Sequence, residues 1–169
     1  MNATPTNYKN KPLGRRARVG AILMSGVVAL GIAVSGAPTA ALAGQATSGY
    51  KTYSVGGVSY KNRAVVNTNI SAACTHSAYA VGLAYPTSKS VAAGWIGIEV
   101  KLFRSNGAVA KSSGWQYNPK TVAQNTPFNP ETASACDATA YYAQAATVGW
   151  TGTKYSSGYL TYRSPNQNS

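Results

Sequence analysis

Apolar and polar side chains alternate over several stretches of this 169-residue chain. The clearest stretch is 96–102, where two isoleucines, a valine and a leucine occupy every second position, with glycine, glutamate and lysine between them. A period of two predicts a strand with one buried face, because successive side chains in a strand point to opposite sides. Apolar residues recur at the same spacing over 79–85 and 142–150. No stretch after residue 43 keeps a helical period over three turns, so the pattern predicts an all-β fold.

Glycine-rich turns separate the predicted strands. Gly56-Gly57 lies between two short strand patterns, and paired glycines readily take the positive φ of a tight hairpin. Ser105-Asn106-Gly107 predicts a second hairpin. We therefore expect a single antiparallel β-sandwich, or a barrel-like variant, of about 6–9 strands. The clearest strands are expected at 53–55, 58–60, 79–85, 96–103, 108–117, 138–150 and 159–163.

Two segments lack a strand pattern. Residues 119–130 are rich in proline and asparagine and predict one long surface loop. Residues 164–169 are polar and predict a frayed tail.

The first 43 residues differ in composition from the rest of the chain. A start of 18 residues with five basic and no acidic side chains is followed by 16 residues that are apolar apart from one serine. Small residues then occupy two of the three positions in Ala41-Leu42-Ala43. This order predicts a secretory signal peptide that spans 1–43 and is cleaved between Ala43 and Gly44.

Two other interpretations of this leader stay open. An uncleaved membrane anchor is one, since the apolar run approaches the length of a spanning helix. Arg15-Arg16 also leaves the twin-arginine export route open beside the general one. With cleavage, we expect residues 44–169 to form one secreted domain, which is extracellular or associated with the cell wall.

Cys74 and Cys136 are the whole cysteine content of the chain. In an oxidising compartment they predict one disulfide, which would stabilise the fold by about 4 kcal/mol by restricting the unfolded chain. Each cysteine lies four residues before an Ala-Tyr pair in an expected strand. The bridge should therefore join neighbouring or facing strands at one end of the sandwich. Zinc is a poor alternative because His76 adds only a third soft ligand, so we predict no metal site.

Basic residues outnumber acidic residues by ten to three in 44–169, which gives this part a net charge of +7. The cations are spread along the chain without a run of three. This charge predicts a nonspecific, salt-sensitive attraction to anionic polymers such as wall polyanions or acidic polysaccharide. Solubility alone is the other interpretation. We expect no specific nucleic-acid partner, and no membrane partner after cleavage.

The chain offers few groups for catalysis. A serine triad would need His76 with Asp137, Glu99 or Glu131, and no protease or hydrolase motif accompanies these residues. Glycoside hydrolysis needs two carboxyls on opposite sides of one bond, and the same three acids are the whole supply. A small ribonuclease would depend on one histidine as its acid. With no phosphate-binding or calcium loop present, we expect no cofactor and favour a noncatalytic protein over a small secreted hydrolase.

Aromatic residues are the abundant candidate chemistry. Residues 44–169 hold eleven tyrosines and three tryptophans, which combine a flat apolar body with a polar edge. Exposed rings of this kind can hold sugars by stacking and hydroxyl contacts, whereas packing within the sandwich or across strands is the alternative. The period of two places Trp95, Lys101 and Phe103 on the side of their strand opposite the apolar row.

We therefore predict a secreted, noncatalytic binding protein that associates with a cell-wall or environmental polysaccharide, anionic or neutral, through an aromatic and cationic face. The candidate binding residues are Trp95, Lys101, Phe103, Arg104 and Trp115. A secreted antibacterial or enzyme-inhibitory protein is the first alternative, acting through its charge or through the loop at 119–130. The small hydrolase is the second.

Overall fold

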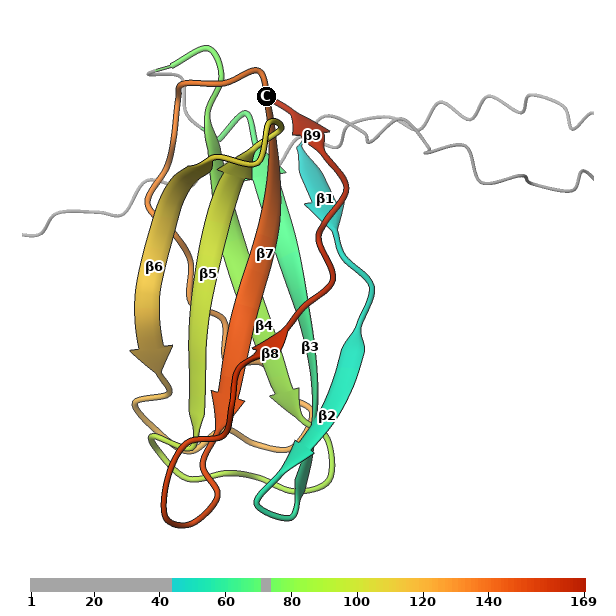
Figure 1. Ribbon diagram of the computed structural model, residues 1–169, viewed down its shortest axis with the longest axis vertical. Coiled ribbons are helices and arrows are strands. Elements are labelled where there is room, and N and C mark those ends of the chain that lie inside the picture. The colour runs from blue at the N-terminus through green and yellow to red at the C-terminus, as the bar shows by residue number, and fades with distance from the viewer. Residues whose placement is uncertain (1–43, 71–73) are drawn as a thin grey trace, which may run out of the picture. The chain divides into compact units, whose positions relative to one another are not determined.

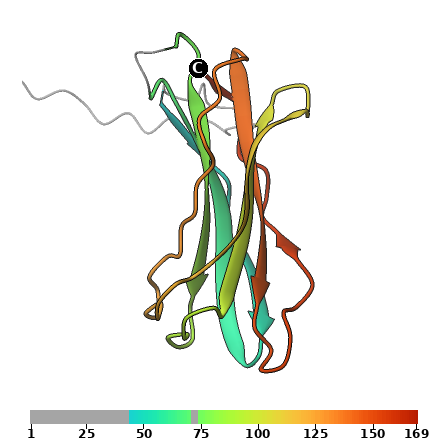
Figure 2. The same cartoon turned by 90° about the vertical axis from the view of Figure 1, so that its left-hand side faces the viewer.

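The computed structural model describes residues 44–70 and 74–169. Within these ranges the chain forms nine strands and no helix, and the strands belong to two antiparallel sheets. The sheets face each other across one hydrophobic core (Figures 1 and 2). The predicted antiparallel β-sandwich is confirmed, whereas the predicted signal peptide and its last residue, Ala43, lie outside the described residues. No helix in the described ranges is long and apolar enough to cross a membrane.

The first sheet is built around the long strand β3 (Val58–Thr68). Strands β1 (Gln45–Thr47) and β2 (Lys51–Val55) follow each other along one edge of β3. Strand β4 (Ala78–Pro86) pairs with the other edge. All three pairs are antiparallel, so β3 carries the register of the whole sheet.

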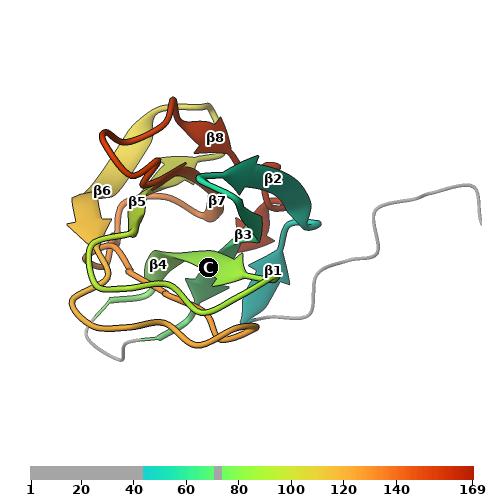
Figure 3. The same ribbon diagram turned by 90° about the horizontal axis from the view of Figure 1, so that it is seen from below.

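The second sheet is built around β5 (Ile96–Arg104) and β7 (Ala140–Gly149), which pair along their full lengths. Strand β6 (Val109–Tyr117) pairs with the other side of β5. The short strands β8 (Tyr159–Leu160) and β9 (Gln167–Asn168) both pair with the other side of β7. In the view from below, this sheet lies over the first one (Figure 3).

Both predicted hairpins are present. Gly56 and Gly57 connect β2 to β3 with φ angles of 57° and 70°, a conformation that glycine adopts without a steric penalty. Gly107, with a φ of 90°, lies in the turn between β5 and β6. Its N–H donates to the carbonyl of Arg104 at 2.9 Å. The glycines thus allow the tight turns at which β2 and β5 end.

The apolar row of β5 forms the centre of the core. Its residues Ile96, Ile98, Val100 and Leu102 are all 0 % exposed, which confirms the burial expected from the alternation. Small residues of β7 face the same core, since its alanines at 143 and 145 are also buried.

Strand β4 presents its small residues to the core. A Cβ atom on Gly82 would lie 2.8 Å from Cγ2 of Ile98 and 3.1 Å from the Cβ atoms of Val100 and Ala145. The sheets approach too closely here for larger side chains. The large residues whose spacing predicted this strand are consequently half-buried on its outer face. They are Tyr79, Val81, Leu83 and Tyr85.

Three tyrosines close one side of the sandwich. The ring of Tyr53 stacks on Tyr60 of the first sheet, with centroids 5.2 Å apart, and on Tyr159 of the second sheet, at 4.3 Å. Asn62 ties the sheets together beside this stack, because its side-chain amide donates to the hydroxyl of Thr147 at 2.8 Å. Aromatic packing and a buried hydrogen bond thus join β2 and β3 to β7 and β8.

The connection from β6 to β7 closes the other side. Residues 128–135 run along the free edge of β4 and form isolated bridges with it. The predicted loop at 119–130 contains no strand, yet Val122 is buried and bridges Val91. The N–H of Asn125 also donates to the carbonyl of Pro86 at 2.7 Å. The loop is therefore held against the sandwich.

The predicted frayed tail is wrong. Strand β9 pairs with β7, and Gln167 is only 1 % exposed. The hydroxyl of Thr68 donates to the carbonyl of Asn168 at 2.9 Å, and Nδ1 of His76 lies 2.7 Å from the Ser169 carbonyl oxygen. Polar residues at 164–169 dock here because neighbouring strands offer backbone and side-chain partners, which a sequence pattern does not display.

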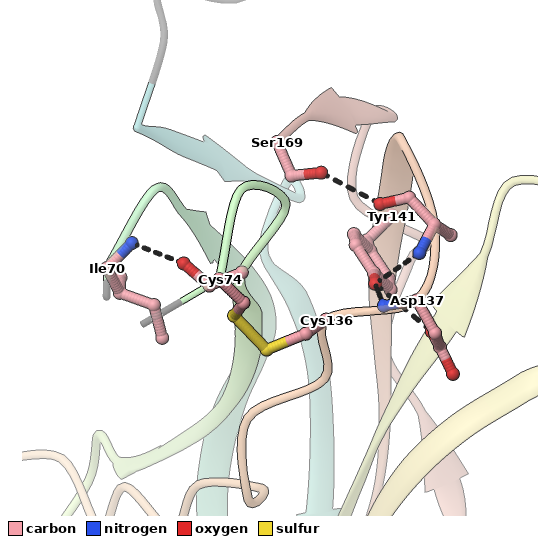
Figure 4. The surroundings of a disulfide bond; sticks show 8 residues. Ile70, Cys74, Cys136, Asp137, Tyr141 and Ser169 are labelled. Atoms are coloured by element: carbon pink, nitrogen blue, oxygen red, sulfur yellow. Dashed lines mark hydrogen bonds between the residues drawn. A yellow bond between two sulfur atoms is a disulfide. The ribbon is translucent and has the colours of Figure 1, made fainter. Parts of the chain in front are cut away.

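The predicted disulfide between Cys74 and Cys136 is confirmed, with Cα atoms 6.0 Å apart (Figure 4). Cys74 precedes β4 and Cys136 precedes β7, so the bridge links the two sheets at one end of the sandwich. Nearby, the hydroxyl of Tyr141 accepts the backbone N–H groups of Asp137 and Ala138, both at 2.8 Å. These bonds hold the turn that leads from the disulfide into β7.

Candidate functional site

The outer face of the second sheet gathers polar and aromatic side chains. On β5 the residues between the buried ones point outward, and these are Gly97, Glu99, Lys101 and Phe103. The register places β6 and β7 residues beside them on the same face. This face therefore presents the residues that alternate with the buried apolar row of β5.

Four rings form what we call the aromatic row, which consists of Trp115, Tyr117, Trp150 and Tyr155. Tyr117 lies opposite Gly97 and Trp115 opposite Glu99 in the ladder, so both β6 rings share the outer face. The ring of Tyr155 lies 4.9 Å from Tyr117 and 5.1 Å from Trp150, measured between centroids.

Much of the aromatic row is open to solvent. The exposed fractions of Trp115, Tyr117 and Tyr155 are 42 %, 43 % and 36 %. These rings lie outside the core, so their exposed surfaces are accessible to a ligand.

Gly97 sets the position of the row. A Cβ atom there would lie 2.7 Å from Cε1 of Tyr117 and 2.7 Å from Cγ2 of Val148. The ring of Tyr117 therefore packs directly against the backbone of β5 at Gly97. The hydroxyl of Tyr155 donates to the carbonyl of Gly94, and burial, with a smaller effect of Tyr117, raises the pKa of Tyr155. That hydroxyl thus stays a donor at neutral pH.

A small depression of about 140 Å³ lies next to the row, and we call it the polar hollow. At its edge Nζ of Lys101 lies 3.3 Å from Oε1 of Glu99, which also accepts the hydroxyl of Ser112 at 3.0 Å. These groups supply both hydrogen-bond donors and acceptors. The lining residues are Glu99, Lys101, Phe103, Gln144, Ala145, Ala146 and Leu160.

Three of the five candidate binding residues meet on this face. Lys101 and Phe103 line the polar hollow, and Trp115 belongs to the aromatic row. Phe103 also stacks on Tyr142, with ring centroids 4.8 Å apart and planes 5° from parallel. Phe103 is therefore held in place by its neighbour and presents only part of its surface.

Trp95 lies at the end of the face rather than at its centre. It precedes β5, is half-buried and packs against the core. Together with Trp150 and Tyr155 it lines a second depression of about 260 Å³. Trp95 thus lies beside Trp150, at one end of the aromatic row.

Arg104 is not part of this face. Its guanidinium forms an ion pair with Asp137 and donates to the carbonyl of Val109 at 3.0 Å. The hydrogen bonds from Arg104, followed by one from Tyr141, hold the pKa of Asp137 below its usual value. Arg104 therefore anchors the turn after the disulfide.

The acids and the histidine do not converge. Glu99 lies on the outer face of the second sheet, whereas Glu131 lies opposite Val81 beside the first sheet. Asp137 is bound to Arg104, and His76 contacts the last residue. Among residues 44–70 and 74–169, no three His, Cys, Asp or Glu side chains lie close enough to share a metal ion.

Sequence reasoning missed three members of the aromatic row. Tyr117 could have been found, because it lies two residues after Trp115 and a strand places such residues on one face. The spacing placed Trp150 on one side of its strand with Val148, and the structure shows that this side is the outer face, since Val148 lies opposite Gly97. Tyr155 lies in the loop before β8, where no period applies, so its position depends on the folded chain.

Comparison with known proteins gave no match, whether with protein-family models, curated proteins or solved structures.

Proposed function

We propose that the protein is an exported, noncatalytic binding protein that holds a polysaccharide chain on the outer face of its second sheet. The observation that carries the proposal is the aromatic row beside the polar hollow. Three of the four rings are between 36 % and 43 % exposed, whereas Tyr60 and Tyr141 are almost completely buried in the core.

The chemistry of a sugar chain matches this surface. Each sugar ring has apolar C–H faces and a rim of hydroxyls, so it is held by flat rings together with a few fixed polar groups. Trp115 lies opposite Glu99 in the ladder. A sugar stacked on Trp115 would therefore have hydroxyls near the Glu99–Lys101 pair and the amide of Gln144.

The proposed ligand is a polysaccharide of the cell wall or of the environment. The predicted leader and the disulfide both support an extracellular location, since disulfides persist in oxidising compartments. The excess of basic residues adds a general attraction to anionic polymers. Stacking should supply the part of the binding that salt does not remove.

Sedimentation with insoluble polymers tests this proposal. The purified protein would be mixed with peptidoglycan, anionic wall polymer, chitin and cellulose, at low salt and again near about 1 M salt. We expect binding to at least one polymer to survive high salt. Binding that disappears in salt for every polymer would reduce the interaction to charge attraction. No binding at all would favour the antibacterial or inhibitory alternative, which killing and enzyme-inhibition assays would then examine.

A further inference from the structure

Two cations on the outer face of the first sheet share one tyrosine ring. Nζ of Lys61 and Cζ of Arg63 each lie 4.8 Å from the ring centroid of Tyr50. Nζ of Lys61 is also 5.1 Å from the ring of Tyr85, which meets Tyr50 edge to face at 5.8 Å. We call these four residues the Tyr50 cluster.

The register of β3 explains why the cluster forms. Tyr60, Asn62 and Ala64 are buried in the core, so the residues between them, Lys61 and Arg63, point to the outer face together. Lys61 lies opposite Tyr85 in the ladder with β4. The two positive charges are thus placed side by side by the backbone rather than by chance contact of long side chains.

Nothing acidic neutralises this pair of charges among the described residues. The ion pairs in 44–70 and 74–169 are Lys101 with Glu99 and Arg104 with Asp137. Neither includes a member of the Tyr50 cluster. Cation–π contacts with two rings offset part of the repulsion, but they leave the net charge in place.

Arg63 also carries an unused hydrogen-bond donor. Its Nε atom is buried and has no hydrogen-bond partner in the described part of the chain. A guanidinium packed on a ring is held in one plane, and its N–H groups suit an anion with several oxygens. Tyr50 and Tyr85 add hydroxyl groups to the cluster. Burial is the main cause that raises the pKa of Tyr85, and its hydroxyl also interacts with Tyr50 and Arg63, so it stays protonated within the cluster.

We propose that the Tyr50 cluster binds a phosphate group. Phosphate offers more oxygen acceptors and more negative charge than a carboxylate, and both properties match two cations with phenolic donors. Lys61 supplies a point charge, and Arg63 supplies a planar pair of donors. The Tyr50 cluster lies on the first sheet and the aromatic row on the second. The phosphate proposal can therefore be tested independently of the polysaccharide proposal.

The phosphate could belong to a small phosphate ester or to a phosphodiester polymer. A nuclear magnetic resonance titration of the ¹⁵N-labelled protein distinguishes these sources, with inorganic phosphate, dimethyl phosphate and sodium acetate as probes at constant ionic strength. The Nε–H signal of Arg63, assigned from its absence in Arg63→Gln, reports changes at the guanidinium, although Nε itself is buried. We expect inorganic phosphate to shift this signal saturably and acetate to shift it much less. A matching response to dimethyl phosphate would support a polymer ligand, and its absence would support a free phosphate or a monoester.

Variants separate a built site from general charge. Arg63→Lys keeps the charge but removes the planar donors, and we expect it to weaken phosphate binding at least about tenfold, as should Lys61→Gln. Lys89→Gln and Lys111→Gln remove exposed charges elsewhere, and we expect affinities within twofold of the unmodified protein. Amide spectra would confirm that each variant is folded. The proposal is overturned if the Arg63 signal does not move, if acetate moves it equally, or if the Lys89 and Lys111 variants lose as much affinity as the cluster variants.

Discussion

Two glycines determine how closely side chains pack on either side of the second sheet. Gly82 lets β4 approach the buried face of β5, and Gly97 lets Tyr117 lie on the outer face. Neither has the positive φ that would demand glycine in the backbone. Both positions are therefore restricted by space alone, which makes them sensitive to a single added methyl group.

Gly82→Ala should destabilise the fold. The new methyl group would overlap Ile98, and overpacking of this kind costs about 1–3 kcal/mol. Gly158→Ala is the matched control, because the nearest atom would be 4.0 Å away, and we expect a change below about 0.5 kcal/mol. Urea unfolding of the two variants measures the difference. Equal stability of Gly82→Ala and the unmodified protein would show that the sheets separate there easily.

Buried tyrosines predict how stability depends on alkaline pH. Burial raises the pKa of Tyr60 to about 12 and also raises that of Tyr53, whereas tyrosines in the unfolded chain ionise near about pH 10. Between these values the folded state retains protons that the unfolded state has lost. The tyrosine contribution is thus fully present below about pH 10 and is lost as pH rises through the folded pKa values.

Tyr60→Phe tests this dependence. Its hydroxyl has no hydrogen-bond partner among the described residues, so at neutral pH we expect a change of no more than about 1 kcal/mol. Above about pH 10 the variant should lose stability less steeply than the unmodified protein in urea unfolding. Parallel curves for the two proteins would mean that Tyr60 ionises in the folded state as easily as in the unfolded one.

At the level of elements, the sequence predicts strands better than it predicts where their faces point. Alternation located β5 and its buried residues, and glycines located both hairpins. The large residues of β4 located that strand as well, but they point outward because the opposing sheet leaves room only for Gly82 and its small neighbours. That distance between sheets is a property of the packed molecule, and no single segment encodes it.

Strand β9 shows the same limit for a polar segment, and it leads to a prediction. Deleting residues 165–169 removes its ladder with β7 and the bonds from Thr68 and His76. Because several partly buried hydrogen bonds are lost together, we expect a loss of about 2–4 kcal/mol in urea unfolding. Asn168→Ala keeps the backbone carbonyl that Thr68 uses, so it should stay within about 0.5 kcal/mol. A deletion as mild as this control would indicate that the tail contributes little.

For the whole molecule, the sandwich separates two surfaces of different chemistry. The second sheet carries the aromatic row and the polar hollow, and the first carries the Tyr50 cluster. Composition indicated rings and positive charge, and strand parity indicated Lys101 and Phe103. The contact between Tyr117 and Tyr155 could not be predicted, because it depends on how the loop before β8 returns to the sheet.

The most direct test of this account is the binding of Trp115→Ala/Tyr117→Ala to the polymer that the unmodified protein holds best near about 1 M salt. Tyr162→Ala is the matched control, since that ring is 56 % exposed but lies outside the aromatic row, beside Lys51. We expect the double variant to bind at least about tenfold more weakly and the control to bind normally, with all three proteins folded. Unchanged binding by the folded double variant, or an equal loss in Tyr162→Ala, would contradict the role proposed for the aromatic row.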